Sequence, residues 1–241
     1  MEVAVTYNFD KFIEEANKIS IVFTEKQLEQ FQLYYEMLVE KNKVMNLTGI
    51  TEWDEVLEKH FLDSISLIRA IDLNQELSVM DMGTGAGFPG IPLKIAFPNL
   101  KVTLADSLNK RVLFLQEVID ALKLEGIEAV HGRAEDLARD KNYREQYDLS
   151  VSRAVANLST LSEYCLPFVK IGGQFISYKS GEIEEEVASS KSAVFLLGGK
   201  VKDTLKFELG ESGRSFIIID KVKGTPKTYP RKAGTPSKKP L

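Results

Sequence analysis

The sequence of 241 residues predicts an α/β fold, in which a doubly wound, Rossmann-like sheet follows an N-terminal helical extension. The first observation is that, from Leu77 onward, short apolar runs typical of buried strands alternate with segments of helical periodicity. Such alternation indicates a parallel sheet with helices on both faces. The second observation is a turn with three glycines between the first apolar run and the first helix-like segment. Strand, glycine turn and helix in this order are typical of nucleotide-binding units.

The individual elements of the sheet domain are predicted from the same periodicity. Strands are expected at Leu77–Met82, Lys101–Asp106, Glu128–His131, Tyr147–Ser152 and Gly173–Lys179. Helices are expected between them at Gly90–Phe97, Asn109–Leu124, Asn157–Val169 and Glu182–Leu196. Two last runs, Val201–Glu208 and Arg214–Val222, follow without a long helix between them, so they predict a closing antiparallel pair.

Three helices are predicted ahead of the sheet. They cover Phe9–Ile19, Glu25–Lys41, which Thr24 starts, and Trp53–Ala70, for which a break near His60 is one alternative. Together they form a helical cap that is too small to be a stable domain alone. The chain thus divides into a helical cap at 1–72, a sheet domain at 73–222 and a basic tail at 223–241.

The composition excludes several classes of protein. Hydrophobic residues make up 44% and charged residues 27%, as in ordinary globular domains. The sequence contains no apolar run of about 18 residues, and its first residues lack the basic and apolar regions of a signal peptide, so we expect a cytoplasmic protein. With Cys165, His60 and His131 as the only cysteine and histidines, neither a disulfide nor a metal site is expected.

The segment Asp81–Gly90 is predicted to bind a nucleotide-like ligand. Gly83, Gly85 and Gly87 allow the backbone to approach a ligand where a Cβ would collide, and they allow positive φ angles. The part from Gly85 to Gly90 also fits the dinucleotide pattern G-x-G-x-x-G, which alone is a weak signal.

Two carboxylates indicate which ligand of this kind is bound. Asp106 ends the next apolar run, 23 residues after Gly83, close to the roughly 20 residues between the glycine turn and a ribose-binding acid. Asp81 completes the pattern D-x-G-x-G-x-G, which resembles the S-adenosylmethionine site of class I methyltransferases more than an NAD site. A carboxylate suits sulfonium and ammonium groups, whereas a pyrophosphate prefers free helix N–H groups. The alternative is that Asp81 only caps the turn.

The loop after the third predicted strand, around Ala134 and Glu135, is expected to face the adenine. There a backbone N–H from Ala134 and a carboxylate from Glu135 can read the edge of the base. Asp136 is an alternative acceptor, and helix capping explains either acid nearly as well.

Cations at two strand ends are further candidates. Lys110 and Arg111 fall in the first turn of a predicted helix, where the helix dipole disfavours them, so either phosphate contact or simple exposure is expected. Arg153 follows the fourth strand and must either meet an anion or pair with an acid, for which Asp81 and Asp148 are the alternatives.

The C-terminal tail has a charge of opposite sign to the rest of the chain. Between Lys221 and Leu241 there are seven basic residues and no acidic residue, a charge of +7. Because the net charge is −4, the remainder carries −11, and this asymmetry indicates a polyanionic partner for the tail. A solvated, partly disordered tail is the alternative, although the Gly, Pro and Tyr residues of Tyr229–Pro236 are more typical of a shaped loop.

These motifs together resemble the GidB (RsmG) family of bacterial small-subunit rRNA guanine-N7 methyltransferases. The resemblance runs from about Tyr34 to Leu241. It rests on Asn46–Thr48, His60–Ser64, Asp81–Leu93, Asp106–Leu108 with Lys110 and Arg111, Arg133–Glu135, Ser152–Val155 and Tyr229–Pro236. Each motif alone is common, but the set is specific.

The resemblance implies a class I methyltransferase sheet and transfer of a methyl group from S-adenosylmethionine to N7 of a guanine in the decoding-region (530) loop of 16S rRNA. The expected cofactor-binding residues are Asp81, Gly83, Gly85, Gly87, Phe88, Asp106, Ser107, Leu108, Ala134, Glu135 and Arg153. The expected RNA-binding residues are Lys110, Arg111, Arg133, Arg231, Lys232, Lys238 and Lys239. We name no catalytic residue, because guanine N7 carries an unprotonated lone pair and needs no base. The expected partner is 16S rRNA or the small ribosomal subunit, and we expect a monomer that binds neither metal nor membrane.

Two other functions are weaker interpretations of the sequence. An NAD-dependent oxidoreductase predicts a Tyr-x-x-x-Lys pair or a well-placed histidine, whereas Tyr143 is followed four residues later by Tyr147. A non-catalytic RNA-binding protein accounts for the tail alone and leaves the glycine turn and Asp106 unexplained.

Overall fold

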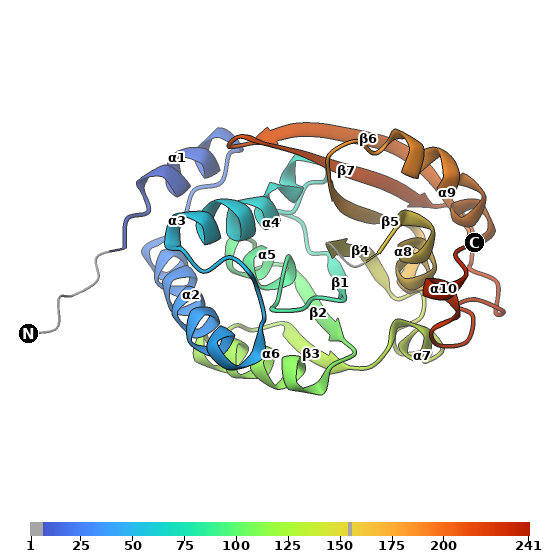
Figure 1. Cartoon of the computed structure of the whole chain (residues 1–241), viewed down its shortest axis with the longest axis horizontal. Helices are drawn as coiled ribbons and strands as arrows, with labels where there is room; N and C mark the ends of the chain where they lie inside the picture. The colour runs from blue at the N-terminus through green and yellow to red at the C-terminus, as the bar shows by residue number, and fades with distance from the viewer. Residues whose placement is uncertain (1–6, 154–155) are drawn as a thin grey trace, which may run out of the picture.

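A seven-stranded sheet runs through the middle of the molecule, with helices on both sides (Figure 1). The computed structural model describes residues 7–153 and 156–241, so Ala154 and Val155 of the predicted strand-end motif lie outside the described residues. The strands are β1 (Ser78–Met82), β2 (Lys101–Asp106), β3 (Ile127–His131), β4 (Tyr147–Arg153), β5 (Val169–Ser180), β6 (Gly199–Leu209) and β7 (Ser212–Lys221). Their order in the sheet is β3-β2-β1-β4-β5-β7-β6.

The pairing of the strands confirms the predicted doubly wound sheet. Strands β1 to β5 run parallel, and the strand order reverses between β1 and β4, which is where such sheets bind ligands. The predicted closing pair is confirmed, since β6 and β7 are antiparallel. It is β7 that joins the sheet, antiparallel to β5, while β6 forms the edge.

The helices occupy the expected segments with shifted ends. They are α1 (Asp10–Lys18), α2 (Glu25–Met45), α3 (Trp53–Val56), α4 (Asp63–Ile65), α5 (Gly90–Ala96), α6 (Asn109–Ala121), α7 (Ala134–Leu137), α8 (Leu158–Cys165), α9 (Glu184–Leu196) and α10 (Thr235–Lys238). Short η segments lie at Leu57–Leu62 (η1, π-helical), Ser66–Arg69 (η2) and Leu166–Phe168 (η3). The segment from Trp53 to Arg69 is continuously helical, so the possible break near His60 takes the form of a π-helical stretch, η1, rather than an interruption. Helix α8 ends earlier than predicted, because Val169 already pairs with Tyr147 across a bulge and thereby starts β5.

The two faces of the sheet bury different sets of side chains, as the period of two in a strand requires. Val79 of β1 belongs to a core that includes α5, α6 and the N-terminal helices, whereas Met80 and Met82 belong to a core formed with α8 and α9. Phe31 of α2 is fully buried in the first core. The N-terminal extension therefore forms an additional layer on one face of the sheet and shares its core.

The C-terminal segment after β7 is folded against the body, beside α7 and α8 (Figure 1). The Arg144 guanidinium donates to the carbonyl oxygens of Thr225 and Tyr229, at 2.7 and 3.0 Å. Thr160 Oγ1 donates to the carbonyl oxygen of Pro236 at 3.1 Å. The shaped loop expected from the sequence is therefore confirmed, and the alternative of a partly disordered tail is wrong.

Candidate cofactor site

A cavity of about 700 Å³ opens at the carboxyl ends of β1, β2 and β4, where the strand order reverses. The residues predicted to bind cofactor or RNA that line it are Gly83, Gly85, Phe88, Asp106, Ser107, Arg111, Arg133, Ala134, Glu135 and Arg153. The fold thus gathers predicted residues from four separate segments of the chain around one cavity.

The glycine turn is tied to the neighbouring strand by its backbone. The N–H groups of Gly83 and Thr84 both donate to the carbonyl oxygen of Ala105 at the end of β2, at 2.9 and 3.2 Å. Gly83 and Gly85 have φ angles of 71° and 64°, which side chains disfavour. A Cβ on Gly85 would meet no atom of the described residues within 4 Å, so the backbone there faces open space along the cavity.

Asp81 lies behind the turn and is fully buried. Its Oδ2 accepts hydrogen bonds from Thr84 Oγ1 and from the Gly90 N–H, at 2.6 and 2.8 Å. These bonds fix the turn, as the capping alternative states. Its Oδ1 has no hydrogen-bond partner among the described residues, and burial raises the pKa of the carboxyl to about 6. The ionised group thus adds negative potential beside the cavity, which suits a cationic ligand.

Two other predicted residues also lie outside the cavity lining. A Cβ on Gly87 would meet Ile91 Cδ1 at 2.5 Å and the hydroxyl of Tyr34 at 2.8 Å, so this glycine allows α2 to pack closely on the turn. Leu108 is 44% exposed, and its N–H donates to Asp106 Oδ1 at 2.9 Å. Both residues support the cavity wall without facing the cavity.

Asp106 closes β2 with its carboxylate turned to the loops around the cavity, and it is only 3% exposed. Its Oδ2 accepts from the Gly85 N–H at 3.0 Å and from Arg111 Nη1 at 3.3 Å. Its Oδ1 accepts the single bond from Leu108 noted above. Because a carboxylate oxygen has two lone pairs, Oδ1 keeps an acceptor position for a ribose hydroxyl.

The C-terminal segment completes the end of the cavity formed by α7. The Gly234 N–H donates to Glu135 Oε1 at 2.9 Å, and both residues line the cavity together with Ala134. The alternative acceptor, Asp136, is exposed and lies outside the lining. The sequence did not predict that the tail forms a wall of this cavity. The positive charge of the tail indicated RNA binding instead.

Arg153 pairs with an acid that the sequence interpretation did not consider. Its Nη1 donates to Asp63 Oδ2 at 2.8 Å, and Arg214 Nε donates to the other oxygen of Asp63 at 2.9 Å. The suggested partners Asp81 and Asp148 are therefore wrong, since Asp148 bonds with residues of other elements. The guanidinium also lies over the Phe88 ring, 4.9 Å from its centroid.

His60 also lines the cavity, although the sequence did not predict it as a site residue. Its ring stacks on Phe88, with centroids 4.5 Å apart and planes 28° apart. Its Nε2 hydrogen-bonds with Thr48 Oγ1 at 2.7 Å. Burial and the adjacent Arg153 charge lower the pKa of His60 to about 4, so the ring is neutral at pH 7. Asn46–Thr48 and His60–Ser64 stood out as motifs, but periodicity gave no indication that they face the glycine turn.

The residues predicted to bind RNA fall into two groups. Arg111 and Arg133 line the cavity, and Lys110, Lys232, Lys238 and Lys239 are exposed. Arg231 is different, because its guanidinium forms three hydrogen bonds to the carboxylate of Glu163, at 2.7 to 3.1 Å. It also donates to the carbonyl oxygen of Lys239 at 2.8 Å. The prediction that Arg231 binds RNA stays a prediction, and in the structure its donors hold the tail on α8.

The residues present fit S-adenosylmethionine. The cavity has the size of a cofactor site. Asp106 offers a ribose acceptor, Ala134 and Glu135 border one end, and the buried carboxylate of Asp81 lies behind the glycine turn. Across residues 7–153 and 156–241, no cluster of three or more His, Cys, Asp or Glu side chains could hold a metal ion. In the same ranges, every helix is too short or too polar to cross a membrane.

Solved structures share the fold. A SAM-dependent methyltransferase from Aquifex aeolicus aligns with a TM-score of 0.53 and 19% identity over 75% of this chain and 97% of that chain. TrmN from Thermus thermophilus aligns with a TM-score of 0.53 and 17% identity over 69% of this chain and 53% of that chain. TYW2 from M. jannaschii, solved in complex with AdoMet, aligns with a TM-score of 0.51 and 17% identity over 66% and 77% of the two chains. Fold and site together define an S-adenosylmethionine-dependent methyltransferase.

The family follows from sequence. Residues 27–215 match the GidB family, described as rRNA small subunit methyltransferase G. Ribosomal RNA small subunit methyltransferase G of Lachnoclostridium phytofermentans is 53% identical over 232 residues, which cover 95% of this chain and 96% of the relative. Its counterpart in Staphylococcus saprophyticus is 55% identical over 223 residues, covering 92% and 93%. The chain belongs to the GidB family of rRNA small subunit methyltransferases.

Proposed function

We propose that this protein transfers a methyl group from S-adenosylmethionine to N7 of a guanine in the decoding-region loop of 16S rRNA. It acts as a cytoplasmic monomer on the RNA or on the small ribosomal subunit. The observation that carries the choice of atom is that the described residues of the cavity offer no group suited to remove a proton. His60 has a pKa of about 4, and we assign the carboxylates of Asp106 and Glu135 to the ribose and the adenine of the cofactor, away from the methyl group.

The chemistry of guanine agrees with such a site. N7 is an acceptor with a free lone pair, whereas the N1 and N2 positions must lose a proton when they are alkylated. S-adenosylmethionine supplies an electrophilic methyl group on a sulfonium sulfur. The protein then has to bind the cofactor and the guanine and hold N7 in line with the methyl group. This positioning alone can provide a large part of a rate enhancement. Phe88, which packs against both His60 and Arg153, gives a rigid wall for that purpose.

We assign different tasks to different parts of the chain. Residues 73–222 bind the cofactor, and the helical extension at 1–72 supplies Thr48, His60 and Asp63 beside the cavity. Residues 223–241 close the adenine end of the cavity and present exposed lysines to RNA. Arg111 and Arg133, which line the cavity, and the exposed Lys110 are the other cations proposed to meet phosphates.

The test is transfer of radiolabelled methyl groups from S-adenosylmethionine to 16S rRNA and to small subunits that lack the modification. We expect labelled N7-methylguanine, located by the chain cleavage that borohydride and aniline cause at this base. Label on another atom or outside the decoding-region loop would contradict the proposal. Calorimetric titration with S-adenosylmethionine and with NAD tests the oxidoreductase alternative in parallel, and binding of NAD alone would favour it.

A further inference from the structure

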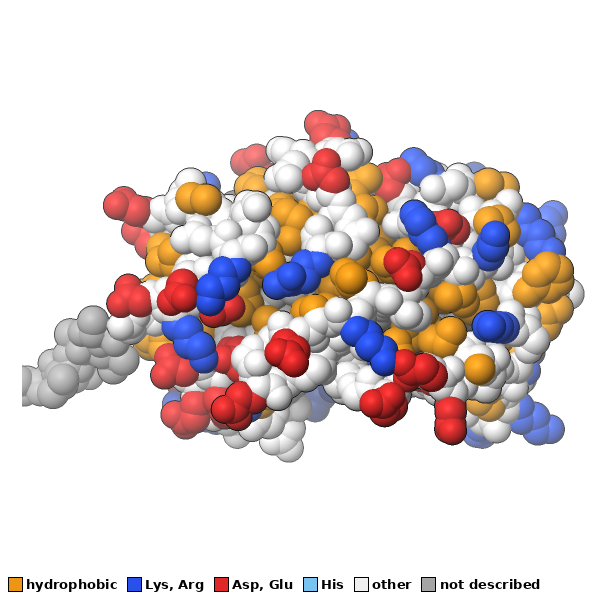
Figure 2. Space-filling model, turned by 90° about the horizontal axis from the view of Figure 1, so that it is seen from above, with side chains coloured by type: hydrophobic (Ala, Val, Ile, Leu, Met, Phe, Trp, Pro, Cys, Tyr) orange, Lys and Arg blue, Asp and Glu red, His pale blue; other side chains and the backbone are white. Residues whose placement is uncertain are grey.

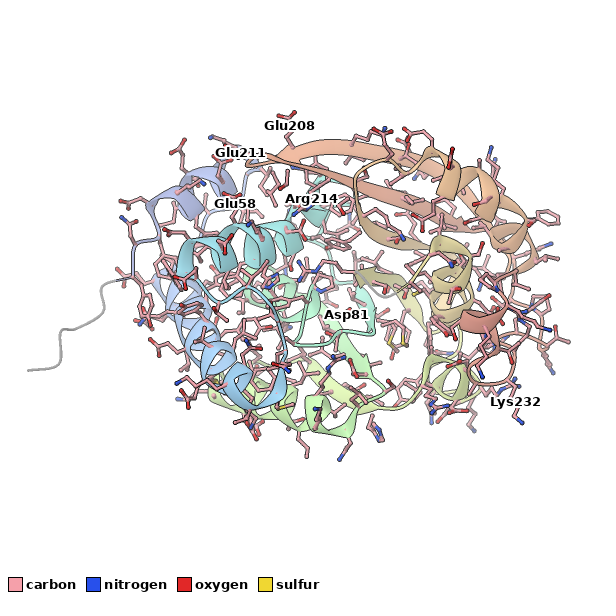
Figure 3. The ribbon with its side chains drawn as sticks, in the orientation of Figure 1. Glu58, Asp81, Glu208, Glu211, Arg214 and Lys232 are labelled. Carbon is pink, nitrogen blue, oxygen red and sulfur yellow. The ribbon has the colours of Figure 1, made fainter. Side chains whose placement is uncertain are left out.

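A second cavity, of about 500 Å³, adjoins the cofactor cavity, and His60 and Arg153 line both of them. Its walls come from η1, α4, β4, β5, α9 and β7, so it lies where the N-terminal extension meets the strand ends. Arg214 marks its β7 side and lies beside α4, far from Lys232 of the C-terminal segment (Figure 3). A ligand in this cavity would therefore lie next to the cofactor and on the opposite side from the tail.

Cations outnumber carboxylates in the lining. The cations are Lys59, Arg153, Lys179 and Arg214, and the carboxylates are Asp63 and Glu186. His60 adds no charge at pH 7, because its pKa is about 4. The described lining is therefore positively charged.

The pairing of these groups leaves one guanidinium charge uncompensated by the described residues. Lys179 Nζ pairs with Glu186 at 2.6 Å, which neutralises both. Asp63 has one negative charge but binds two guanidinium groups, one on each oxygen. The side chains of Arg153 and Arg214 are only 15% and 19% exposed, so water compensates the excess charge incompletely. A partly buried positive charge of this kind favours an anion.

We propose that this second cavity binds a backbone phosphate of the RNA, at or next to the nucleotide that is methylated. The inference rests on the function proposed above, which makes a polyanion the substrate. Guanidinium groups bind phosphate through their N–H donors. Arg214 donates Nε to Asp63 and Nη1 to the carbonyl oxygen of Gly213, which leaves Nη2 without a partner among the described residues. Because Arg153 lines both cavities, a phosphate held here fixes a nucleotide beside the cofactor. The cavity thus positions the target base.

The experiment compares Arg214→Gln and Lys59→Gln with wild type in the full-length protein. The rate of rRNA methylation is measured against RNA concentration at several salt concentrations. For Arg214→Gln we expect a KM for RNA about ten- to a hundredfold higher, since the variant cannot form a charged hydrogen bond to phosphate. The slope of log affinity against log salt should fall by about 0.7–0.9 for each phosphate that the protein no longer binds. The Kd for S-adenosylmethionine should not change, since neither Arg214 nor Lys59 lines the cofactor cavity.

Lys202→Gln is the matched control, because it removes one exposed charge from β6 outside the cavity. Lys59→Gln covers the case in which Arg214→Gln fails to fold, since the Lys59 ammonium pairs with Glu55 at the surface. Arg214→Gln leaves Asp63 paired with Arg153, so we expect folded protein. Two outcomes would show a purely structural role and overturn the proposal. In the first, both variants have the same slope of log affinity against log salt as wild type. In the second, the affinity for S-adenosylmethionine decreases as much as the affinity for RNA.

Small competitors identify the source of the anion. Guanosine 5′-monophosphate, guanosine and inorganic phosphate are added separately to the methylation reaction. We expect the monophosphate to inhibit wild type more strongly than guanosine does, and this difference to vanish in Arg214→Gln. Inorganic phosphate that inhibits as strongly as the monophosphate would show a general anion site and overturn the RNA assignment. Absence of rRNA methylation by wild type would instead contradict the function proposed above.

Discussion

At the scale of the residue, Asp81 combines two roles in one carboxylate. Oδ2 holds the turn through Thr84 and Gly90, while Oδ1 has no partner among the described residues. Burial raises its pKa from 3.8 to about 6, so the folded state binds the proton more tightly than the unfolded state. The contribution of Asp81 to the free energy of unfolding therefore increases as the pH falls from 7 through 6 toward 4.

Cofactor affinity should respond to the same proton with the opposite sign. Protonation removes a negative charge near the cavity, so we expect affinity for S-adenosylmethionine to fall as the pH decreases through about 6. The affinity for S-adenosylhomocysteine, which lacks the sulfonium charge, should fall less. In Asp81→Asn the affinities for the two ligands should change with pH in the same way. Titrations of both ligands between pH 5 and 8 test this, and identical pH profiles for wild type and variant would contradict it.

Asp106 should be the strongest single contributor to cofactor affinity. It is buried at the end of β2 and keeps an acceptor position on Oδ1. Asp106→Ala should weaken binding of S-adenosylmethionine by about 1.5–3 kcal/mol, or roughly ten- to a hundredfold in Kd. Asp120→Ala, which removes an exposed carboxylate from α6, is the control and should bind normally. A normal Kd in a folded Asp106→Ala protein would remove Asp106 from the site.

At the scale of the element, the C-terminal segment contributes Gly234 to the lining of the candidate cofactor cavity. Arg231 binds the fully buried Glu163 of α8, and three residues later Gly234 donates to Glu135. Arg231→Gln leaves a buried carboxylate without its cation, which costs about 3–5 kcal/mol of stability. We therefore expect a lower melting temperature together with weaker binding of S-adenosylmethionine.

The neighbouring residue provides the control for this prediction. Lys232 carries the same charge and is exposed, and Lys232→Gln should change neither the melting temperature nor the Kd. Thermal unfolding and calorimetric titration of the two variants are the measurements. If Arg231→Gln bound the cofactor as wild type does, the C-terminal segment would be a structural strap with no part in the cavity.

Sequence alone predicted the parts of the site that are local in the chain. The glycine turn and Asp106 belong to one strand–turn–helix unit and the strand that follows, so spacing was sufficient. The contacts of Asp63 with Arg153 and Arg214 span 90 and 151 residues, and the contact of Glu163 with Arg231 spans 68. Periodicity shows which side chains are buried, but it does not show which distant charge each will meet. The net charge of the tail likewise predicted that Arg231 binds RNA, because the sequence does not show that Glu163 is buried next to it.

At the scale of the whole molecule, positive charge is unevenly distributed. In the face shown in Figure 2, basic side chains gather toward the end where α9 and the C-terminal segment lie, and acidic side chains are numerous toward the N-terminal helices. The charge of +7 on residues 221–241 overstates what RNA can meet. Lys221 is buried and donates to Leu166 and Thr225, and Arg231 is bound to Glu163. The exposed lysines are therefore the groups left to meet phosphate.

RNA affinity should consequently depend on Lys232, Lys238 and Lys239 as a group. Replacing all three by glutamine should weaken RNA binding and reduce the salt slope by about 0.7–0.9 for each phosphate that these lysines bind. Affinity for S-adenosylmethionine should stay the same, because these side chains are exposed and lie outside the cavity lining. RNA affinity at several salt concentrations is the measurement.

The matched control for this triple variant replaces Lys11, Lys18 and Lys43 by glutamine. These exposed lysines lie on α1 and α2, and each pairs with a glutamate at the surface. The two triple variants have the same net charge, so a general effect of charge would weaken RNA binding equally in both. A local contact of the C-terminal segment would weaken it only in the first. If RNA affinity depended on salt concentration in the same way for both triple variants, the RNA-binding surface would lie elsewhere, near the cofactor cavity around Lys110 and Arg133.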